Sequence, residues 1–120
     1  MTRNVSKAPG VKIPLPGKPV RGSKSGAPIM ALFDLLGRRW SMGILWTLSE
    51  TGPLAFRALQ DQCETISPTV LSLRLRELQR AGFVAKTGEG YDVSFLGRQI
   101  YEQLVPLGKT AKAWATELKA

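Results

Sequence analysis

The chain has 120 residues, which is enough for one small domain and too few for two independent hydrophobic cores. It contains no His and a single Cys, which excludes a Cys-rich zinc site and an intramolecular disulfide and removes the most common general base. The 17 Lys and Arg residues exceed the 9 Asp and Glu residues, and the resulting net charge of +8 predicts an anionic partner. No segment is apolar and long enough to span a membrane, and the Met1 end lacks the apolar core of a secretory signal. We therefore expect a soluble, cytoplasmic protein.

The first 26 residues differ in composition from the rest of the chain. They contain four prolines, no acidic side chain and six basic ones, namely Arg3, Lys7, Lys12, Lys18, Arg21 and Lys24. Residues 27–120 carry a net charge of only +2. Because Pro and Gly at this density give no helical or strand period, we predict a disordered basic arm over 1–26. Such an arm either follows DNA phosphates or only improves solubility, and both interpretations stay open.

Three helices and a short extended segment are expected next. Apolar residues at helical spacing predict a helix over about 28–36. A second helix is expected to begin at a Ser41 cap and to end before a Gly-Pro pair. Residues 54–56 are expected to be extended, and a brief third helix follows as far as Cys63.

A fourth helix and a hairpin come after these elements. Ser67 followed by Pro68 is a strong helix start, and periodic leucines continue to about Arg80. Segments 83–87 and 91–93 flank a Gly-Glu-Gly sequence, which predicts a β-hairpin with a tight turn.

The last helix carries a seam of regularly spaced apolar residues. Ser94 can cap it, and residues 97–119 are expected to form the dimerisation helix. Its apolar positions alternate in steps of four and three, and they are Ile100, Leu104, Leu107, Ala111, Trp114 and Leu118. A helix of this length is more than one small core needs, so it packs either across the body or against a partner. We favour the partner.

This order of elements predicts a mainly α fold with a small β-hairpin wing, a winged helix-turn-helix over 27–120 with a C-terminal dimerisation helix. Alternating strand and helix units are absent, and no Gly-rich loop follows a strand, which disfavours a nucleotide-binding fold. No nucleophile has an adjacent base, and no metal cage can be assembled. We therefore expect no enzymatic activity, no cofactor and no metal.

The fourth helix has two contrasting faces. Leu71, Leu75 and Leu78 share one side and are expected to face the core. The other side, with its edge, carries Thr69, Ser72, Leu73, Arg76 and Arg80. Base edges are read mainly by the N-terminal part of such a helix, so the first four are candidates for base contacts and Arg80 for a phosphate contact. An ordinary solvated helix surface is the alternative.

Other polar residues nearby extend this candidate DNA-binding set. Arg74 is expected either to contact a phosphate or to pair with Glu77 three residues later. Ser67 at the start of the helix and Lys86 on the first hairpin strand are further candidates.

Three motifs resemble, in order and spacing, those of the HxlR-type winged-helix transcriptional regulators of bacteria, within the MarR-like superfamily. They are Leu32–Trp40 (LFDLLGRRW), Leu71–Leu78 (LSLRLREL) and Tyr91–Ser94 with Leu96–Arg98. The resemblance covers about residues 27–119. It implies a homodimer whose first and last helices form the interface, which adds Ile29 and Phe33 to the seam. It also implies two reading helices in successive major grooves of a pseudo-palindromic operator, with phosphate contacts from Arg38, Arg39 and Arg57.

The chain departs from the family pattern in two regions. Many members have a Cys suited to redox sensing before the first helix, where this chain has Ala27. The acidic Asp61 and Glu64 should disfavour a Cys63 thiolate, so we expect Cys63 to fill the core. The wing is short, with Glu89 at its tip, which predicts weak minor-groove contact by the wing.

The leading functional hypothesis is a dimeric, sequence-specific DNA-binding transcriptional regulator, more often expected to be a repressor. The alternative is a non-specific nucleic-acid-binding protein dominated by the basic arm. A protein-interaction module without DNA contact is a third hypothesis. A small-molecule effector is possible but is not indicated by the aromatic residues.

Overall fold

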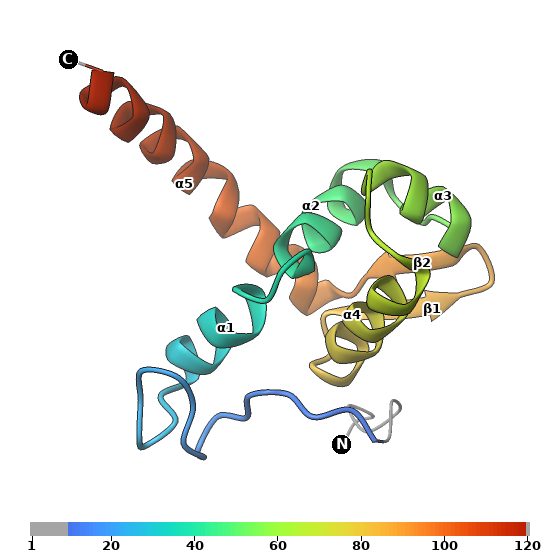
Figure 1. The fold of residues 1–120 in the computed structure, drawn as a ribbon, viewed down its shortest axis with the longest axis horizontal. Coiled ribbons are helices and arrows are strands. Elements are labelled where there is room, and N and C mark those ends of the chain that lie inside the picture. The colour runs from blue at the N-terminus through green and yellow to red at the C-terminus, as the bar shows by residue number, and fades with distance from the viewer. Residues whose placement is uncertain (1–9, 120) are drawn as a thin grey trace.

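The computed structural model describes residues 10–119 (Figure 1). Five helices and one hairpin follow in the predicted order: α1 (Pro28–Leu36), α2 (Ser41–Thr51), α3 (Phe56–Gln62), α4 (Pro68–Arg80), β1 (Val84–Thr87), β2 (Gly90–Val93) and α5 (Phe95–Lys119). The mainly α class with a two-stranded wing and a long C-terminal helix is confirmed.

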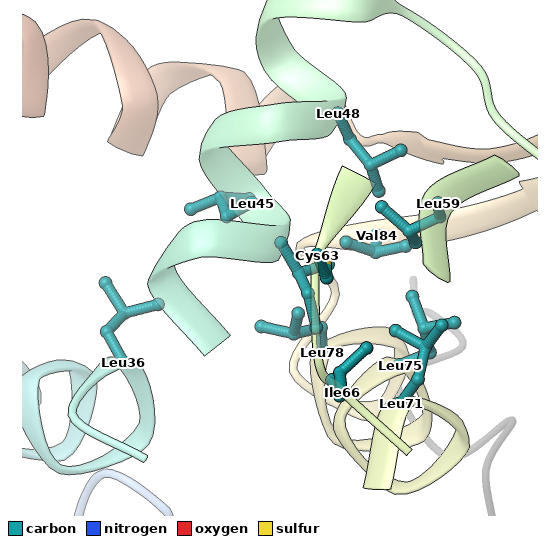
Figure 2. Close-up of a cluster of buried hydrophobic side chains, with 11 residues drawn as sticks. Leu36, Leu45, Leu48, Leu59, Cys63, Ile66, Leu71, Leu75, Leu78 and Val84 are labelled. Atoms are coloured by element: carbon teal, nitrogen blue, oxygen red, sulfur yellow. The ribbon is translucent and has the colours of Figure 1, made fainter. Parts of the chain in front are cut away.

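The core lies between α2, α3, α4 and the start of β1 (Figure 2). Leu45 and Leu48 of α2 are fully buried, and the predicted core stripe of α4 packs on the same cluster. Burying each such side chain contributes about 1.5 to 3 kcal/mol. The packing therefore fixes which side of α4 faces inward and which side remains on the surface.

Serine caps define the starts of α4 and α5. The Ser67 Oγ accepts a hydrogen bond from the Val70 backbone N–H at 3.2 Å. The Ser94 Oγ accepts one from the Gly97 N–H at 3.0 Å, as expected for a cap. The predicted Ser41 cap of α2 is wrong, because Ser41 is already helical and buried. Trp40 precedes the helix instead, in a left-handed conformation with φ of 79°, and its side chain packs against the core.

The two-stranded wing gains a third partner from the segment before α3. Strands β1 and β2 are antiparallel, with Val84 opposite Val93 and Thr87 opposite Gly90. Leu54 exchanges two backbone hydrogen bonds with Tyr91 of β2, at 3.0 and 2.8 Å. Of the expected extended segment 54–56, Leu54 forms a bridge to the wing, whereas Phe56 already belongs to α3.

Helix α5 begins on α2 and then leaves the body. Tyr101 packs edge-on against Trp46 with ring centroids 5.1 Å apart, and its hydroxyl donates to Glu50 at 2.9 Å. Residues 109–119 are all exposed, and this half of the helix extends away from the other elements (Figure 1). Among residues 10–119, no helix is both long and apolar enough to cross a membrane.

Residues 10–26 correct the predicted disordered arm. Val11 is 3% exposed, and the Gly17 N–H donates to the Gly26 carbonyl at 2.8 Å to close a loop over 17–26. The Arg21 N–H donates to the Asp34 carboxylate of α1 at 3.2 Å. The physical reason is that the apolar side chains between the prolines pack against the folded body. Proline also reduces the conformational entropy that the segment loses when it becomes ordered. Residues 1–9 of the predicted arm lie outside the described residues.

Candidate nucleic-acid interface

The outward face of α4 presents the groups that the sequence predicts for base contacts. Thr69 and Arg76 are exposed, whereas Ser72 and Leu73 are half-buried beside them. The predicted core stripe on the other side is at most 1% exposed. This face therefore offers a guanidinium, two hydroxyls and an aliphatic side chain along slightly more than two helical turns.

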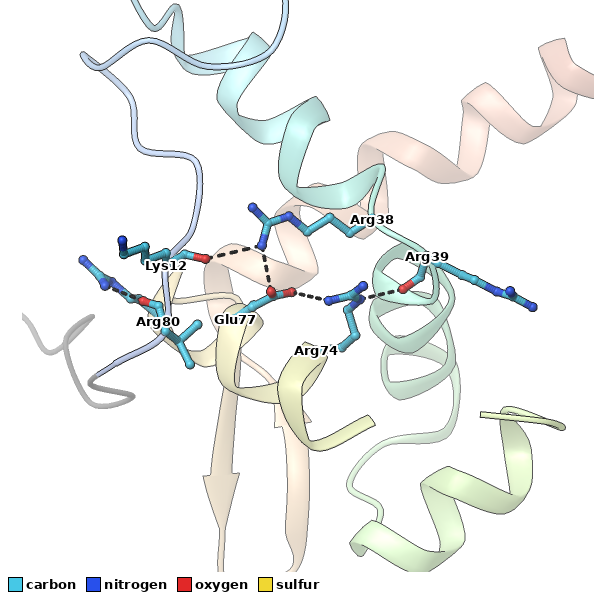
Figure 3. Close-up of polar contacts among 7 residues, drawn as sticks. Lys12, Arg38, Arg39, Arg74, Glu77 and Arg80 are labelled. Carbon is cyan, nitrogen blue, oxygen red and sulfur yellow. Dashed lines mark hydrogen bonds and ion pairs between the residues drawn. The ribbon is translucent and has the colours of Figure 1, made fainter. Parts of the chain in front are cut away.

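A buried carboxylate ties α4 to the turn between α1 and α2 (Figure 3). Glu77, which is 4% exposed, accepts from the Arg38 guanidinium at 2.7 Å and from the Arg74 guanidinium at 3.1 Å. Arg74 also donates through Nε to the Arg39 carbonyl at 2.7 Å. The two ion pairs therefore hold the middle of α4 against the residues that lead into α2.

The predicted Arg74–Glu77 pair is confirmed, but the role of Arg38 in this cluster was missed. Arg38 lies 39 residues from Glu77, and a contact at that separation leaves no local pattern in the sequence. The one local signal is the pair of adjacent arginines after α1, for which the family resemblance implies phosphate contacts.

Two arginines also hold the N-terminal strap, by which we mean residues 10–16. The Arg80 guanidinium donates to the Val11 carbonyl at 2.6 Å, and the Arg38 guanidinium donates to the Lys12 carbonyl at 3.3 Å (Figure 3). Three of the arginines that the sequence nominates for DNA, Arg38, Arg74 and Arg80, are thus engaged with acceptors of the protein itself.

The other nominated basic side chains are exposed to solvent. The Arg39 guanidinium lies 4.9 Å from the Trp40 ring, and the Lys86 ammonium lies 5.5 Å from the Tyr91 ring. Arg57 is 86% exposed and only 4.0 Å from Asp61, which is a weak surface pair. These side chains come from the α1–α2 turn, from β1 and from α3.

Cys63 is a core residue in this structure. It is 8% exposed and belongs to the central cluster of Figure 2. Burial raises the pKa of its thiol above the ordinary value of 9.0. The sequence-based expectation of a core residue is confirmed, with desolvation as the cause instead of neighbouring acids.

This burial predicts a specific pH dependence of stability. The raised pKa keeps the thiol protonated in the folded state, whereas the unfolded thiol ionises near pH 9.0. Ionisation of Cys63 therefore leaves the free energy of unfolding unchanged well below pH 9.0 and decreases it as the pH rises above that value. Comparing wild type with Cys63→Ala in urea titrations at pH 8 and pH 10 isolates this effect from that of other groups. An identical pH dependence in both proteins would contradict it.

The apolar seam on α5 is largely uncovered. Leu107, Trp114 and Leu118 are 57, 65 and 69% exposed, and Ala111 between them is also exposed. Ile100 and Leu104, nearer the body, are half-buried. On α1, Ile29 and Phe33 are 54 and 55% exposed. Both helices thus present apolar side chains without a covering element among the described residues.

Residues 10–119 contain no group of three or more His, Cys, Asp or Glu side chains placed to hold an ion.

Comparison with known proteins links this geometry to a family. The model of the HxlR-like helix-turn-helix family matches residues 35–119. The chain is 36% identical over 59 residues to the uncharacterized HTH-type transcriptional regulator BH0655 of Halalkalibacterium halodurans, covering 49% of this chain and 52% of that protein. It is 29% identical over 89 residues to the uncharacterized HTH-type transcriptional regulator YybR of Bacillus subtilis, covering 74% and 61%. The chain thus spans between half and two thirds of the length of these relatives.

Two solved structures are also similar. The crystal structure of quinone-bound YodB from B. subtilis has a TM-score of 0.63 at 28% identity, covering 75% of this chain and 97% of that one. A possible HxlR family transcriptional factor from Thermoplasma volcanium has a TM-score of 0.63 at 25% identity, covering 74% and 85%.

Proposed function

The chain belongs to the HxlR-like helix-turn-helix family of transcriptional regulators, and from this premise we propose that it is a dimeric, sequence-specific DNA-binding repressor that reads the major groove with α4. The observation that carries the proposal is the outward face of α4, which combines Thr69 and Arg76 with a core-facing side that holds the helix rigidly. Such a protein acts where the DNA is, which in a bacterium is the cytoplasm.

Each group on the reading face has a chemical counterpart in the major groove. The Arg76 guanidinium can donate two hydrogen bonds to the N7 and O6 of a guanine, and Leu73 suits a thymine methyl. The hydroxyls of Thr69 and Ser72 suit either donors or acceptors on base edges. Ser67, at the exposed N-terminus of α4, lies where a phosphate would accept from free backbone N–H groups.

The arginines divide into two roles. Arg39, Arg57 and Lys86 are exposed, and we assign them to phosphates. We assign Arg38, Arg74 and Arg80 to positioning α4 and the strap, because their guanidiniums already donate to Glu77 and to backbone carbonyls.

Replacing Arg76 by Ala tests the reading face. We expect a loss of about 1 to 3 kcal/mol of binding free energy on the preferred site, with a much smaller loss on random DNA. Fluorescence anisotropy at fixed salt measures both affinities. Arg98→Ala is the matched control, because Arg98 is also exposed but lies on α5. Equal losses on specific and random DNA would assign Arg76 to a phosphate and contradict base reading.

The seam supports a homodimer as the DNA-binding form. The C-terminal end of α5, where Leu107 and Trp114 are exposed, buries apolar surface when it packs against a second copy. Helix α1 offers Ile29 and Phe33 to the same interface. A dimer also places two reading helices on one face of a pseudo-palindromic operator, one helical turn apart.

The double change Leu107→Ala and Trp114→Ala tests this assembly. Multi-angle light scattering should give twice the 13.1 kDa chain mass for wild type and a single chain mass for the variant. Lys112→Ala, on the same exposed part of α5, should remain dimeric. A dimeric double variant would place the interface elsewhere.

A further inference from the structure

A cavity of about 460 Å³ lies between the N-terminal strap, α1, the end of α4 and the start of α5. Its size falls within the range of small-molecule sites in proteins, about 300 to 1,000 Å³. Nearly all of its lining is apolar, and the residues that define its walls are Ile13, Leu15, Leu32, Leu35, Phe83 and Ile100. Each wall comes from a different element, so the cavity exists only because the strap lies over the body.

One charged side chain, Arg80, lines this apolar space. Its guanidinium uses one nitrogen to hold the Val11 carbonyl, which does not neutralise the charge. In the described residues no carboxylate forms an ion pair with Arg80, and residues 1–9 contain no Asp or Glu. This guanidinium lies at the rim of the cavity, since its partner Val11 is not a lining residue. A guanidinium with unused donors at the rim of an apolar cavity is complementary to an anion.

The strap packs against the body and forms a fixed wall of the cavity. Ile13 and Leu15 are half-buried against the body. The loop that follows packs tightly, since a side chain at Gly26 would overlap the backbone of Lys18. The strap is therefore anchored by Arg80 at one end and by the 17–26 loop at the other, and its middle forms one side of the cavity.

We propose that this cavity binds a compact apolar molecule with a single negative charge, such as an aromatic or branched aliphatic acid. The apolar part of the ligand packs between the strap and α1, and its acidic group accepts from Arg80. Because the ligand contacts strap and body together, its binding holds the strap closed. The inference goes beyond the proposed DNA binding and does not depend on it, because every readout below is made without DNA.

The probe for the test is 8-anilinonaphthalene-1-sulfonate, which is apolar, carries one anionic group and fluoresces when it is buried. Titrated into the full chain, it should bind at one site per chain, and Ile13→Glu should weaken this binding at least tenfold by placing a carboxylate in the strap wall. Ile29→Glu is the matched control, because Ile29 is 54% exposed on the α1 surface and does not line the cavity. Binding that survives Ile13→Glu but is lost in Ile29→Glu would assign the probe to the seam and overturn the proposal.

The charge and the strap have separate readouts. Arg80→Gln should weaken the sulfonate probe about tenfold more than neutral N-phenyl-1-naphthylamine, because both probes are affected by the weakened contact with the Val11 carbonyl but only the sulfonate loses its charged partner. Equal effects on both probes would refute the anion site.

The sulfonate probe should also slow tryptic cleavage after Lys12, Arg21 and Lys24 in the wild-type chain, relative to cleavage after Lys119. Unchanged cleavage at saturating probe would contradict closure of the strap.

Discussion

The Glu77→Ala variant should lose about 2 to 3 kcal/mol of unfolding free energy, because it leaves two guanidiniums facing each other without their shared carboxylate. Removing one partner of a fully buried pair costs about 3 to 5 kcal/mol. We reduce that range because the Arg38 and Arg74 side chains are 31 and 18% exposed, so solvent partly screens their charges.

Urea unfolding followed by circular dichroism measures this loss. Glu102→Ala, an exposed acidic residue on α5, should change stability by no more than about 0.5 kcal/mol. Glu77→Gln should lie between the two, since the amide oxygen still accepts one hydrogen bond. A loss below about 1 kcal/mol for Glu77→Ala would show that this cluster does not hold α4 in place.

The second large effect is expected at Gly97, the buried glycine in the first turn of α5. A Cβ there would overlap the Phe83 carbonyl oxygen and would lie 3.4 Å from the Leu45 side chain. The start of α5 cannot shift to relieve the overlap without straining the hydrogen bond from the Ser94 N–H to the same carbonyl, at 2.9 Å. Gly97→Ala should therefore destabilise the fold by about 3 kcal/mol.

Gly43 supplies the matched control for this substitution. It lies inside α2, is exposed, and a Cβ there would meet no atom within 4 Å. Gly43→Ala should raise the unfolding free energy by about 0.5 to 1 kcal/mol, because Ala loses less backbone entropy than Gly in a helix. Thermal unfolding compares both variants. Stabilisation by Gly97→Ala as well would mean that α5 begins farther from Phe83 than the structure places it.

The helices and the wing could be predicted because their signals are local. Ser67 and Ser94 precede periodic apolar runs, and both serines cap as expected. The strap could not be predicted in the same way, because Val11 and Ile13 are scattered among prolines and show no period. Their burial depends on a surface formed by α1 and α4, which no local pattern describes.

Within the candidate site, too, only the features with local sequence signals could be predicted. The core stripe of α4 follows from helical spacing, and the exposure of Thr69 and Arg76 follows from it in turn. The sequence does not predict which arginines already bind acceptors within the protein, because an arginine with a free guanidinium and one with a paired guanidinium are identical in sequence. Arg38 and Arg39 are adjacent in the chain, yet one reaches Glu77 and the other points to solvent beside Trp40 (Figure 3).

Selection from randomised double-stranded DNA with the full-length chain, at physiological salt, tests most directly whether α4 reads sequence. We predict an inverted repeat with half-sites about 10 base pairs apart, centre to centre. We also predict that Arg76→Ala relaxes the preference at one position in each half-site without abolishing binding. Retention of DNA with no enriched sequence would contradict sequence reading and would favour non-specific nucleic-acid association through the basic N-terminal residues.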